Sequence, residues 1–351
     1  MAETLILATK LPPESPDDEL ALFVNLSRRP DTLLEAAEVA KLTGQLPKSS
    51  RTGHIHAGEQ YLGSYIRAPL SEGGCASLRE SAIADVMIGL SQGILRMPRY
   101  RGHQSLPIVP LEELGNRGLL HRDIGTHNAV QPPYRGPFRI HPISPAPSYP
   151  ILWGHSANRE RCLIVEPDSQ GEVLPGCDEQ AKHVWETATR LHFNLDFRLN
   201  SQSLAACCTP DPTVGGRAWP NFCLKEKYWE HIMVLWANST LGLMSSWWQG
   251  SLQQQGRSIL TISSLPQLRV FDPRSLSDQQ LEKSKRVFKE FENRQLLPAN
   301  EAYRDKSRIE IDRSVLVDIL GFPKDILEPL ENLRLQWCNE PSVHGGKSTK
   351  P

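Results

Sequence analysis

The sequence predicts a mixed α/β protein, an α+β arrangement of several modules along 351 residues. Short apolar runs typical of strands alternate with longer segments in which apolar residues recur every three or four positions, as they do in helices. Hydrophobic residues make up 39 % and charged residues 23 % of the chain, which is ordinary for a soluble globular protein. A chain of this length can bury one large core or two to three smaller ones.

Charge and cysteine content limit the function classes. The formal net charge is −1, so the chain lacks the basic character of a free-standing DNA-binding protein, although this does not exclude a local basic face. The seven cysteines include no C-x-x-C pair, and their spacing fits neither a zinc site nor a disulfide framework. No leader-like segment follows Met1, and no apolar run approaches the roughly 18 residues needed to span a bilayer. We therefore expect a cytoplasmic protein.

The first 47 residues predict one part of a sheet. Residues 4–8 and 20–26 are strand-like apolar runs, and Asp31 is placed to cap a helix over residues 32–42. Two strands and one helix cannot bury both faces of a sheet. We therefore expect residues 1–47 to complete a sheet whose other strands belong to a different polypeptide.

Residues 48–150 predict a helical and proline-rich connector. A helix is expected over residues 75–92, where apolar side chains form one side. Residues 131–150 are dense in proline, which disfavours both a central strand and a helix interior. We expect this stretch to lie over a neighbouring module as a connector.

Residues 151–275 predict the domain that carries the candidate site. We expect a strand over residues 161–165, a helix over 178–190, and a long apolar helix over 228–248 that forms the core. Polar and apolar residues alternate over 192–199, so a strand there would have one polar face. That face would carry His192, Asn194, Asp196 and Arg198.

Side chains able to read base edges are concentrated in this domain. In the major groove of DNA, Arg pairs with guanine, and Asn or Gln pairs with adenine. The alternative interpretation is that these groups form the polar edge of an ordinary core. The candidate DNA-binding residues are Arg190, Asn194, Arg198, Asn200 and Gln202 on one lip of a groove, Gln253, Gln254, Gln255 and Arg257 on the other, and Arg217 and Trp219 in the glycine-hinged loop between them.

Residues 276–340 predict two C-terminal helices, followed by a disordered tail over residues 341–351. Ser277 and Gln280 have the spacing of a capping box that starts the first helix. The second helix is expected to end at Gly321. Charges on the first helix predict a solvated face, with a strip that faces phosphates as the alternative. The basic residues of that strip are Lys283, Lys285, Arg286 and Lys289.

Three short motifs are interpreted as incidental. Residues 121–123 (H-R-D) with Asn128 have the spacing of a kinase catalytic loop, but no glycine-rich loop precedes them and no D-F-G follows. Residues 131–134 (Q-P-P-Y) are similar to the motif with which amino-methyltransferases hold a flipped base, but they begin with Gln. His54 and His56 lack a further metal ligand at a recognisable offset. No catalytic, cofactor-binding or metal-binding residue is therefore assigned.

Several segments together resemble one family. Asn238-Ser239 lies inside an apolar helical segment, a polar loop with Gly256 follows, and Leu265-Pro266 precedes Val-Phe-Asp-Pro273. This order is similar to the closing segment of the target-recognition domains of large adenine-N6 DNA methyltransferases of the type IIG-like restriction–modification kind, and of type I specificity subunits. Further resembling segments are residues 4–30, similar to the last strand pair of the methyltransferase sheet, 106–115, similar to the connector beyond it, and 297–304 with 308–321, similar to the helical tail.

The resemblance implies a DNA target-recognition module of a restriction–modification or phage-defence methyltransferase. The family binds S-adenosylmethionine and holds its target adenine with motifs that have no counterpart in this sequence. We therefore expect double-stranded DNA and a separate S-adenosylmethionine-binding catalytic part as partners, and no methylation by the chain alone. Base flipping would belong to the catalytic part. Two alternatives stay open, namely an enzyme of unrecognised chemistry around His121, Asp123 and His127, and an assembly protein without DNA contact.

Overall fold

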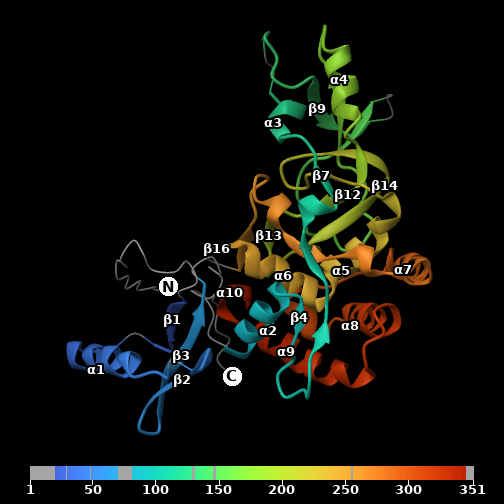
Figure 1. The fold of residues 1–351 in the computed structure, drawn as a ribbon. Coiled ribbons are helices and arrows are strands. Elements are labelled where there is room, and N and C mark those ends of the chain that lie inside the picture. Colours follow the sequence, from blue (N-terminus) through green and yellow to red (C-terminus); the bar gives the residue numbers. More distant parts are fainter. Residues whose placement is uncertain are drawn as a thin grey trace, which may run out of the picture.

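The computed structural model describes residues 20–28, 30–47, 49–69, 81–128, 131–144, 148–253 and 256–344. The protein is mixed α/β, with several small sheets and helices gathered around more than one hydrophobic core (Figure 1). A sheet-rich upper lobe stands on a helical base, and an N-terminal sheet with its helix lies to one side.

The N-terminal unit is a three-stranded antiparallel sheet with one helix. Its strands are ordered β1 (Ala21–Leu26), β3 (Gln60–Ala68) and β2 (Thr52–Ala57). The helix α1 (Leu33–Gly44) packs on this sheet through a small core. That core consists of Val39, Ile55, Leu62 and Tyr65.

The first predicted strand, residues 4–8, lies outside the described residues. Two other expectations for this unit need correction. β1 pairs with β3, which belongs to the segment expected to be a connector. The N-cap of α1 is Thr32 rather than Asp31, because the Thr32 hydroxyl accepts a hydrogen bond from the Glu35 amide at 3.1 Å.

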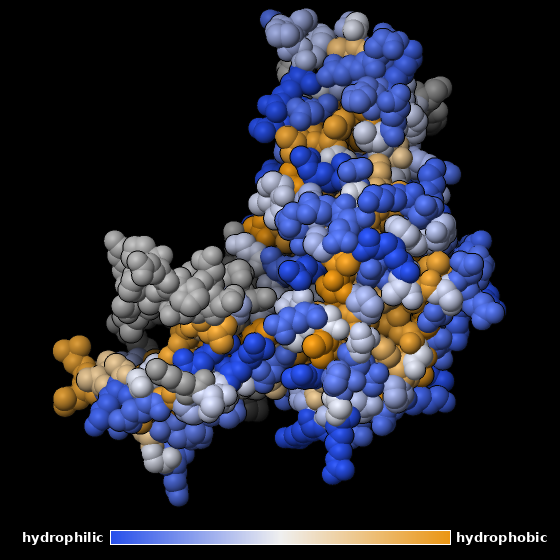
Figure 2. All heavy atoms as spheres, viewed as in Figure 1, coloured by the Kyte–Doolittle hydropathy of each residue, from blue (hydrophilic) through white to orange (hydrophobic). Residues whose placement is uncertain are grey.

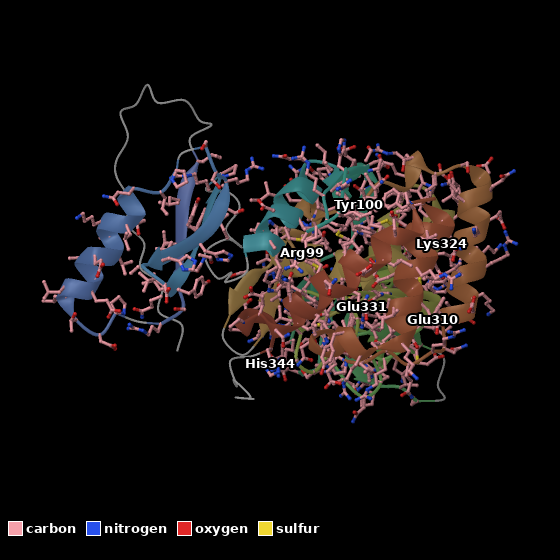
Figure 3. The ribbon with its side chains drawn as sticks, turned by 90° about the horizontal axis from the view of Figure 1, so that it is seen from below. Arg99, Tyr100, Glu310, Lys324, Glu331 and His344 are labelled. Atoms are coloured by element: carbon pink, nitrogen blue, oxygen red, sulfur yellow. The ribbon has the colours of Figure 1, made fainter. Side chains whose placement is uncertain are left out.

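The helical base is formed by residues from distant parts of the chain. Its helices are α2 (Ser81–Ser91), α5 (Glu230–Asn238), α6 (Thr240–Gln249), α7 (Asp278–Phe291), α8 (Lys306–Arg313), α9 (Leu327–Asn339) and α10 (Pro341–His344). Their apolar faces meet in one hydrophobic core that also includes side chains of β12 and β14. The expected recognition domain and the expected C-terminal helices therefore share a core. In Figure 3, α2 lies between this base and the N-terminal sheet, and Thr52 Oγ1 donates a hydrogen bond to Asp85 Oδ2 at 2.7 Å across the junction.

The upper lobe is organised by a six-stranded sheet with the order β12-β14-β10-β11-β9-β8. Its strands are β8 (Gly125–Thr126), β9 (Phe138–Pro142), β10 (Tyr149–Leu152), β11 (Ser169–Val173), β12 (Thr189–Phe193) and β14 (Ala206–Gly215), and its helices are α3 (His121–Ile124) and α4 (Asp178–Trp185). A second core lies within this lobe and includes Phe138, Ile151 and Val214. The sheet crosses the predicted domain boundary at residue 150.

The proline-rich stretch 131–150 is not a mere connector. It supplies β9 and the first residues of β10, both of which have neighbours on two sides in the sheet. Pro150 is tolerated because it pairs only with Gln170 of β11, whereas pairing with β14 begins at Ile151. The missing N–H of Pro150 therefore interrupts no ladder on the β14 side.

Three further elements differ from the prediction. Residues 161–165 form no strand and contribute only the isolated bridge between Ile164 and Cys208. The helix that begins at Asp178 ends at Trp185. The predicted helix over residues 228–248 is two helices, because the chain leaves the helical conformation at Ser239. The other strand pairs are β4 (Ile94–Leu95) with β5 (Gln104–Ser105), β6 (Ile108–Pro110) with β18 (Arg269–Phe271), and β7 (Gly115–Arg117) with β15 (Phe222–Leu224).

The C-terminal helices agree more closely with the sequence. The capping box at the start of α7 is present, with reciprocal hydrogen bonds between Ser277 and Gln280. The second helix begins after Asp305, continues as a π-helical segment over Ser314–Ile319, and gives way at Gly321, whose φ of +76° suits glycine. The tail is ordered further than expected, since Pro341–His344 form α10; residues 345–351 lie outside the described residues.

A buried polar network holds the break between α5 and α6. The Asp312 carboxylate accepts hydrogen bonds from the Thr240 amide at 2.7 Å and from Arg334 Nη1 at 2.6 Å. Arg308 Nη1 donates to the Asn238 carbonyl, the last residue of α5, at 2.6 Å. All of these groups are buried, so each depends on its partner for compensation of lost hydration.

Asp312→Ala is expected to destabilise the protein by about 3–5 kcal/mol, because it leaves the Arg334 guanidinium buried without its carboxylate. Urea unfolding measures the change. The matched control is Glu310→Ala on the same helix as Asp312. It removes an exposed carboxylate that pairs with Arg294, and it should cost at most about 1 kcal/mol. Equal losses in the two variants would contradict the assigned role of Asp312.

Candidate nucleic-acid interface

Members of both predicted lips meet in one small sheet. β13 (Asp196–Arg198), β17 (Arg257–Ile259) and β16 (Ser251–Gln253) pair in that order, with Arg198 opposite Arg257 and Arg257 opposite Gln253. Residues directly opposite one another in an antiparallel sheet share a face. Arg198, Arg257 and Gln253 therefore occupy one row of register positions across the sheet, which we call the Arg–Arg–Gln row. The lips do not face each other across a groove, as the sequence had predicted, because their strands are hydrogen-bonded neighbours.

An ion pair fixes the middle of the row. Arg257 Nη2 lies 2.5 Å from Asp196 Oδ2, and Arg257 Nε contacts Asp196 Oδ1. The hydrogen bond from Arg257 is the largest cause of a lowered pKa at Asp196, so this carboxylate is charged at neutral pH. The bidentate contact uses the Nε–Nη2 edge of the guanidinium. It leaves Nη1 of Arg257 directed away from the carboxylate.

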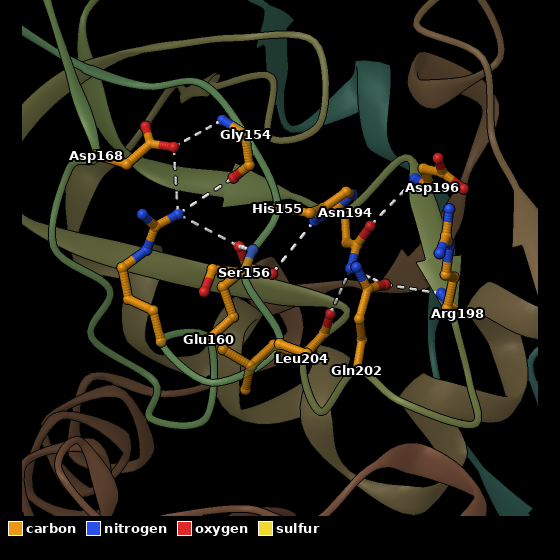
Figure 4. A network of polar contacts seen from close by, with 12 residues as sticks. Gly154, His155, Ser156, Glu160, Asp168, Asn194, Asp196, Arg198, Gln202 and Leu204 are labelled. Carbon is orange, nitrogen blue, oxygen red and sulfur yellow. Dashed lines mark hydrogen bonds and ion pairs between the residues drawn. The ribbon is translucent and has the colours of Figure 1, made fainter. Parts of the chain in front are cut away.

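Two of the predicted contact residues are structural. Asn194 and Gln202 are each only 4 % exposed. Asn194 Nδ2 donates to Gln202 Oε1 at 3.3 Å and to the Leu204 carbonyl at 3.0 Å, and its Oδ1 accepts from the Asp196 amide at 3.1 Å (Figure 4). Gln202 Oε1 also accepts from the Arg198 amide at 2.7 Å. These amides connect β13 to the turn that follows it, so we omit them from the proposed contact surface.

Arg190 and Trp219 also face inward. Arg190 Nε donates to the Thr209 carbonyl at 2.9 Å, and its Nη1 lies 3.7 Å from Glu230 Oε2. Trp219 is fully buried beneath the ring of His155, with the two ring centroids 5.7 Å apart. Trp219 is therefore part of the interior, and Arg190 is half-buried with its guanidinium held by the Thr209 carbonyl and Glu230.

The remaining predicted residues lie at the surface or outside the described part of the chain. Arg198, Asn200 and Arg217 are exposed, and among the described residues neither arginine forms an ion pair. Gln254 and Gln255 lie outside the described residues, as does the side chain of Gln253. The surface available to a ligand is therefore narrower than predicted, with Arg198, Arg257 and Arg217 as its charged members.

A polar network beside the row was not predicted. Asp168 accepts hydrogen bonds from the Trp153 amide at 2.6 Å and the Gly154 amide at 2.9 Å, and Arg159 Nη2 lies 3.3 Å from it (Figure 4). The Glu160 carboxylate is completely buried and lies 3.2 Å from His155 Nδ1. The sequence around it, N-R-E-R, resembles a solvated loop, so no local signal indicates that Glu160 is buried.

The positive strip predicted on α7 is partly neutralised. Lys283 Nζ donates to the Asp318 carbonyl at 2.5 Å, and Lys289 Nζ lies 2.5 Å from Glu292 Oε1. Lys285 and Arg286 are exposed. In Figure 1, α7 lies at the edge of the molecule opposite β16, so this helix and the Arg–Arg–Gln row cannot share one contact surface.

Residues of two of the incidental motifs have local partners. Asp123 pairs with Arg135, whose Nε lies 2.7 Å from Asp123 Oδ1. His54 and His56 stand beside Tyr61 on the β2–β3 hairpin. Within the described ranges, no group of three or more His, Cys, Asp or Glu side chains is arranged to hold a metal ion.

Comparisons with known proteins add no identification. No protein-family model matches the chain, and no curated protein or solved structure shows significant similarity to it. Among the helices of the described segments, none combines the length and apolar character needed to cross a membrane.

Stability is expected to fall on acidification through His192. This side chain is fully buried, and His192 Nδ1 donates to the Trp219 carbonyl at 3.0 Å. Burial lowers the pKa of His192 from 6.5 to about 4. As the pH falls, His192 is protonated in the unfolded chain at a higher pH than in the folded protein. The stabilisation of the folded state by neutral His192 is therefore present above pH 6.5 and is lost as the pH falls towards 4.

Between pH 6.5 and 5, the wild type should lose about 2 kcal/mol more stability than His192→Asn, which keeps a donor but cannot ionise. Urea unfolding at several pH values measures this difference. Parallel stability–pH curves for the two proteins would show that His192 does not stay neutral in the folded state.

Proposed function

We propose that the chain is the DNA target-recognition part of a restriction–modification or phage-defence adenine-N6 methyltransferase in the cytoplasm, acting with a separate S-adenosylmethionine-binding catalytic part. The observation that carries the proposal is the Arg–Arg–Gln row, in which Arg198, Arg257 and Gln253 stand in register across three strands. Four of the segments that resemble the family share the core beneath it, namely residues 106–115, 238–273, 297–304 and 308–321.

The shape of this region suits the major groove. B-DNA admits a two-stranded β-ribbon there, and β16 and β17 form such a hairpin. Adjacent strands are about 4.8 Å apart, so a row across three strands spans roughly 10 Å, which is close to the width of the groove. Side chains with fork-shaped donors in that row could contact neighbouring base pairs.

The pairing of Arg257 with Asp196 favours recognition over simple charge attraction. A guanidinium held by a carboxylate loses less rotational freedom when it contacts a base. The same carboxylate neutralises its charge, so attraction to phosphates must come from other cations. Arg198 supplies one such charge beside the ion pair.

The N-terminal unit is the proposed contact with the catalytic part. Leu33 and Leu34, in the first turn of α1, are 90 % and 83 % exposed and form an apolar tip at the far end of this unit (Figure 2). Such exposure of adjacent leucines is unusual on a surface that faces only water. An α/β partner would cover them while supplying the methyl donor and the base-flipping site.

The proposal is tested by selecting bound duplexes from a random-sequence pool. The wild type should enrich a defined sequence, and Arg198→Gln or Arg257→Gln should relax the preference at particular positions, with a loss of about 1–3 kcal/mol in discrimination. Methylation of the enriched sequence should require the added catalytic part.

Arg286→Gln on α7 is the matched control, because it removes an exposed guanidinium from the opposite edge of the molecule. It should leave the enriched sequence unchanged. The proposed function is wrong if the wild type, with or without its catalytic part, enriches no sequence.

A further inference from the structure

A second group of cations and rings lies in the upper lobe around Trp153. We define the Trp153 surface as Trp153, His121, His127, Arg122 and Arg217. The rings of His121 and His127 stand edge-on to the Trp153 indole, with centroids 6.3 and 5.4 Å from it. Trp153 and His121 are half-buried and the other members are exposed.

The loop that presents Arg217 is fixed on both sides. A side chain at Gly215 would come within 2.1 Å of the Asn221 amide nitrogen, and one at Gly216 within 2.5 Å of Trp153 Cα. Trp219, two residues after Arg217, is fully buried. The G-G-R-A-W sequence thus forms a tight loop on Trp153 whose exposed member is a guanidinium.

The backbone of Trp153 is equally constrained. Its amide and that of Gly154 both donate to the Asp168 carboxylate, which also contacts Arg159. His127 is oriented by a contact of 3.2 Å between its Nδ1 and the Ile140 carbonyl, which leaves Nε2 as its free ring nitrogen. The surface is therefore a set of positioned groups rather than a collection of mobile side chains.

The charge balance of this surface is positive. Arg122 and Arg217 form no ion pair within the described ranges, whereas the nearby Arg135 is paired with Asp123. Burial is the largest cause of a lowered pKa at His121, followed by the charges of Arg217 and Arg122; Arg135 acts in the same direction and Asp123 opposes it. His121 is therefore neutral at pH 7 and gains a proton only in more acidic solution.

We propose that the Trp153 surface binds the phosphodiester backbone of the DNA duplex whose bases meet the Arg–Arg–Gln row. This inference rests on the proposed function, and it assigns the phosphate contacts that the neutralised Arg257 does not supply. Half or more of the hydrogen bonds in protein–DNA complexes go to phosphate and sugar groups, which set the register of the protein on the duplex.

The two surfaces are connected through a short path of contacts. The Leu195 amide, next to Asp196, donates to the Ala218 carbonyl, next to Trp219, at 3.2 Å. The loop that contains Trp219 packs on Trp153 through Gly216. In Figure 1, α3 and the β13–β16 region lie along the same side of the upper lobe. One duplex lying along this side would meet both.

The test compares two double variants in fluorescence-anisotropy titrations of a labelled duplex between 50 and 200 mM salt. Arg122→Gln with Arg217→Gln should make the plot of log affinity against log salt shallower by about 2, since each lost phosphate contact removes roughly 0.9 from the slope. The control, Lys285→Gln with Arg286→Gln, removes equal charge from α7 and should leave the slope unchanged. All proteins should keep the wild-type unfolding midpoint.

Failure of this inference is distinguishable from failure of the proposed function. If the wild type binds DNA and the Arg122/Arg217 variant has the same salt slope, the role of the Trp153 surface is wrong. The proposed function is not affected by that result. If the salt slope is shallower only in the α7 control, the phosphate contacts are made by α7 and the role of the Trp153 surface is wrong. A wild type that binds no DNA, with or without its catalytic part, would contradict both proposals.

The His121 imidazole provides an independent readout. A phosphate near His121 favours the protonated ring, so the DNA affinity of the wild type should rise between pH 7.5 and 5.5. His121→Gln should lose most of that rise, while Arg122 and Arg217 keep the binding at pH 7.5. An unaltered pH dependence in the His121 variant would exclude this ring from the contact.

Discussion

The buried contacts of Asn238, Arg308 and Asp312 are the constraint on which the rest of the structure depends. Asp312 closes the start of α6 and Arg308 closes the end of α5, so the Thr240 amide and the Asn238 carbonyl keep hydrogen-bond partners where the chain breaks at Ser239. The Asn238 side chain reaches the backbone of Ala205 and Ala206, where β14 begins. β14 runs from there through the central sheet to the loop that presents Arg217. The position of the upper lobe on the helical base is therefore set by side chains that are far from any proposed DNA contact.

This arrangement changes the meaning of the resemblance to methyltransferases. Two of the segments that carry it, Asn238-Ser239 and residues 308–321, meet in the buried network. Their residue types are accounted for by packing and hydrogen bonding, so these segments carry no argument for a DNA contact. The proposed DNA binding rests instead on the Arg–Arg–Gln row and the Trp153 surface, both of which present charge outward. The proposed function and the fold thus rest on different residues of the same chain.

Local signals in the sequence were sufficient for some elements and not for others. The capping box of α7 and the stop at Gly321 are short-range patterns, and both are present. The break at Ser239 could not be predicted, because the apolar periodicity continues through it. The group that stabilises the break, Asp312, is 72 residues from its partner Thr240. In the candidate site, composition drew attention to the fork-shaped side chains but could not separate Asn194, which is buried, from Arg198, which is exposed. Strand pairing between β13 and β17 is likewise a non-local contact, so two lips were predicted where there is one sheet.

Both proposals require a DNA duplex to lie against the β13–β17–β16 sheet. Hydrogen–deuterium exchange of the whole protein, with and without the duplex that it enriches, measures this directly. The account predicts slower exchange in residues 196–198, 215–217 and 251–259 when DNA is bound, and unchanged exchange in residues 278–291 of α7. Protection confined to α7, or no protection anywhere although DNA is bound, would contradict it.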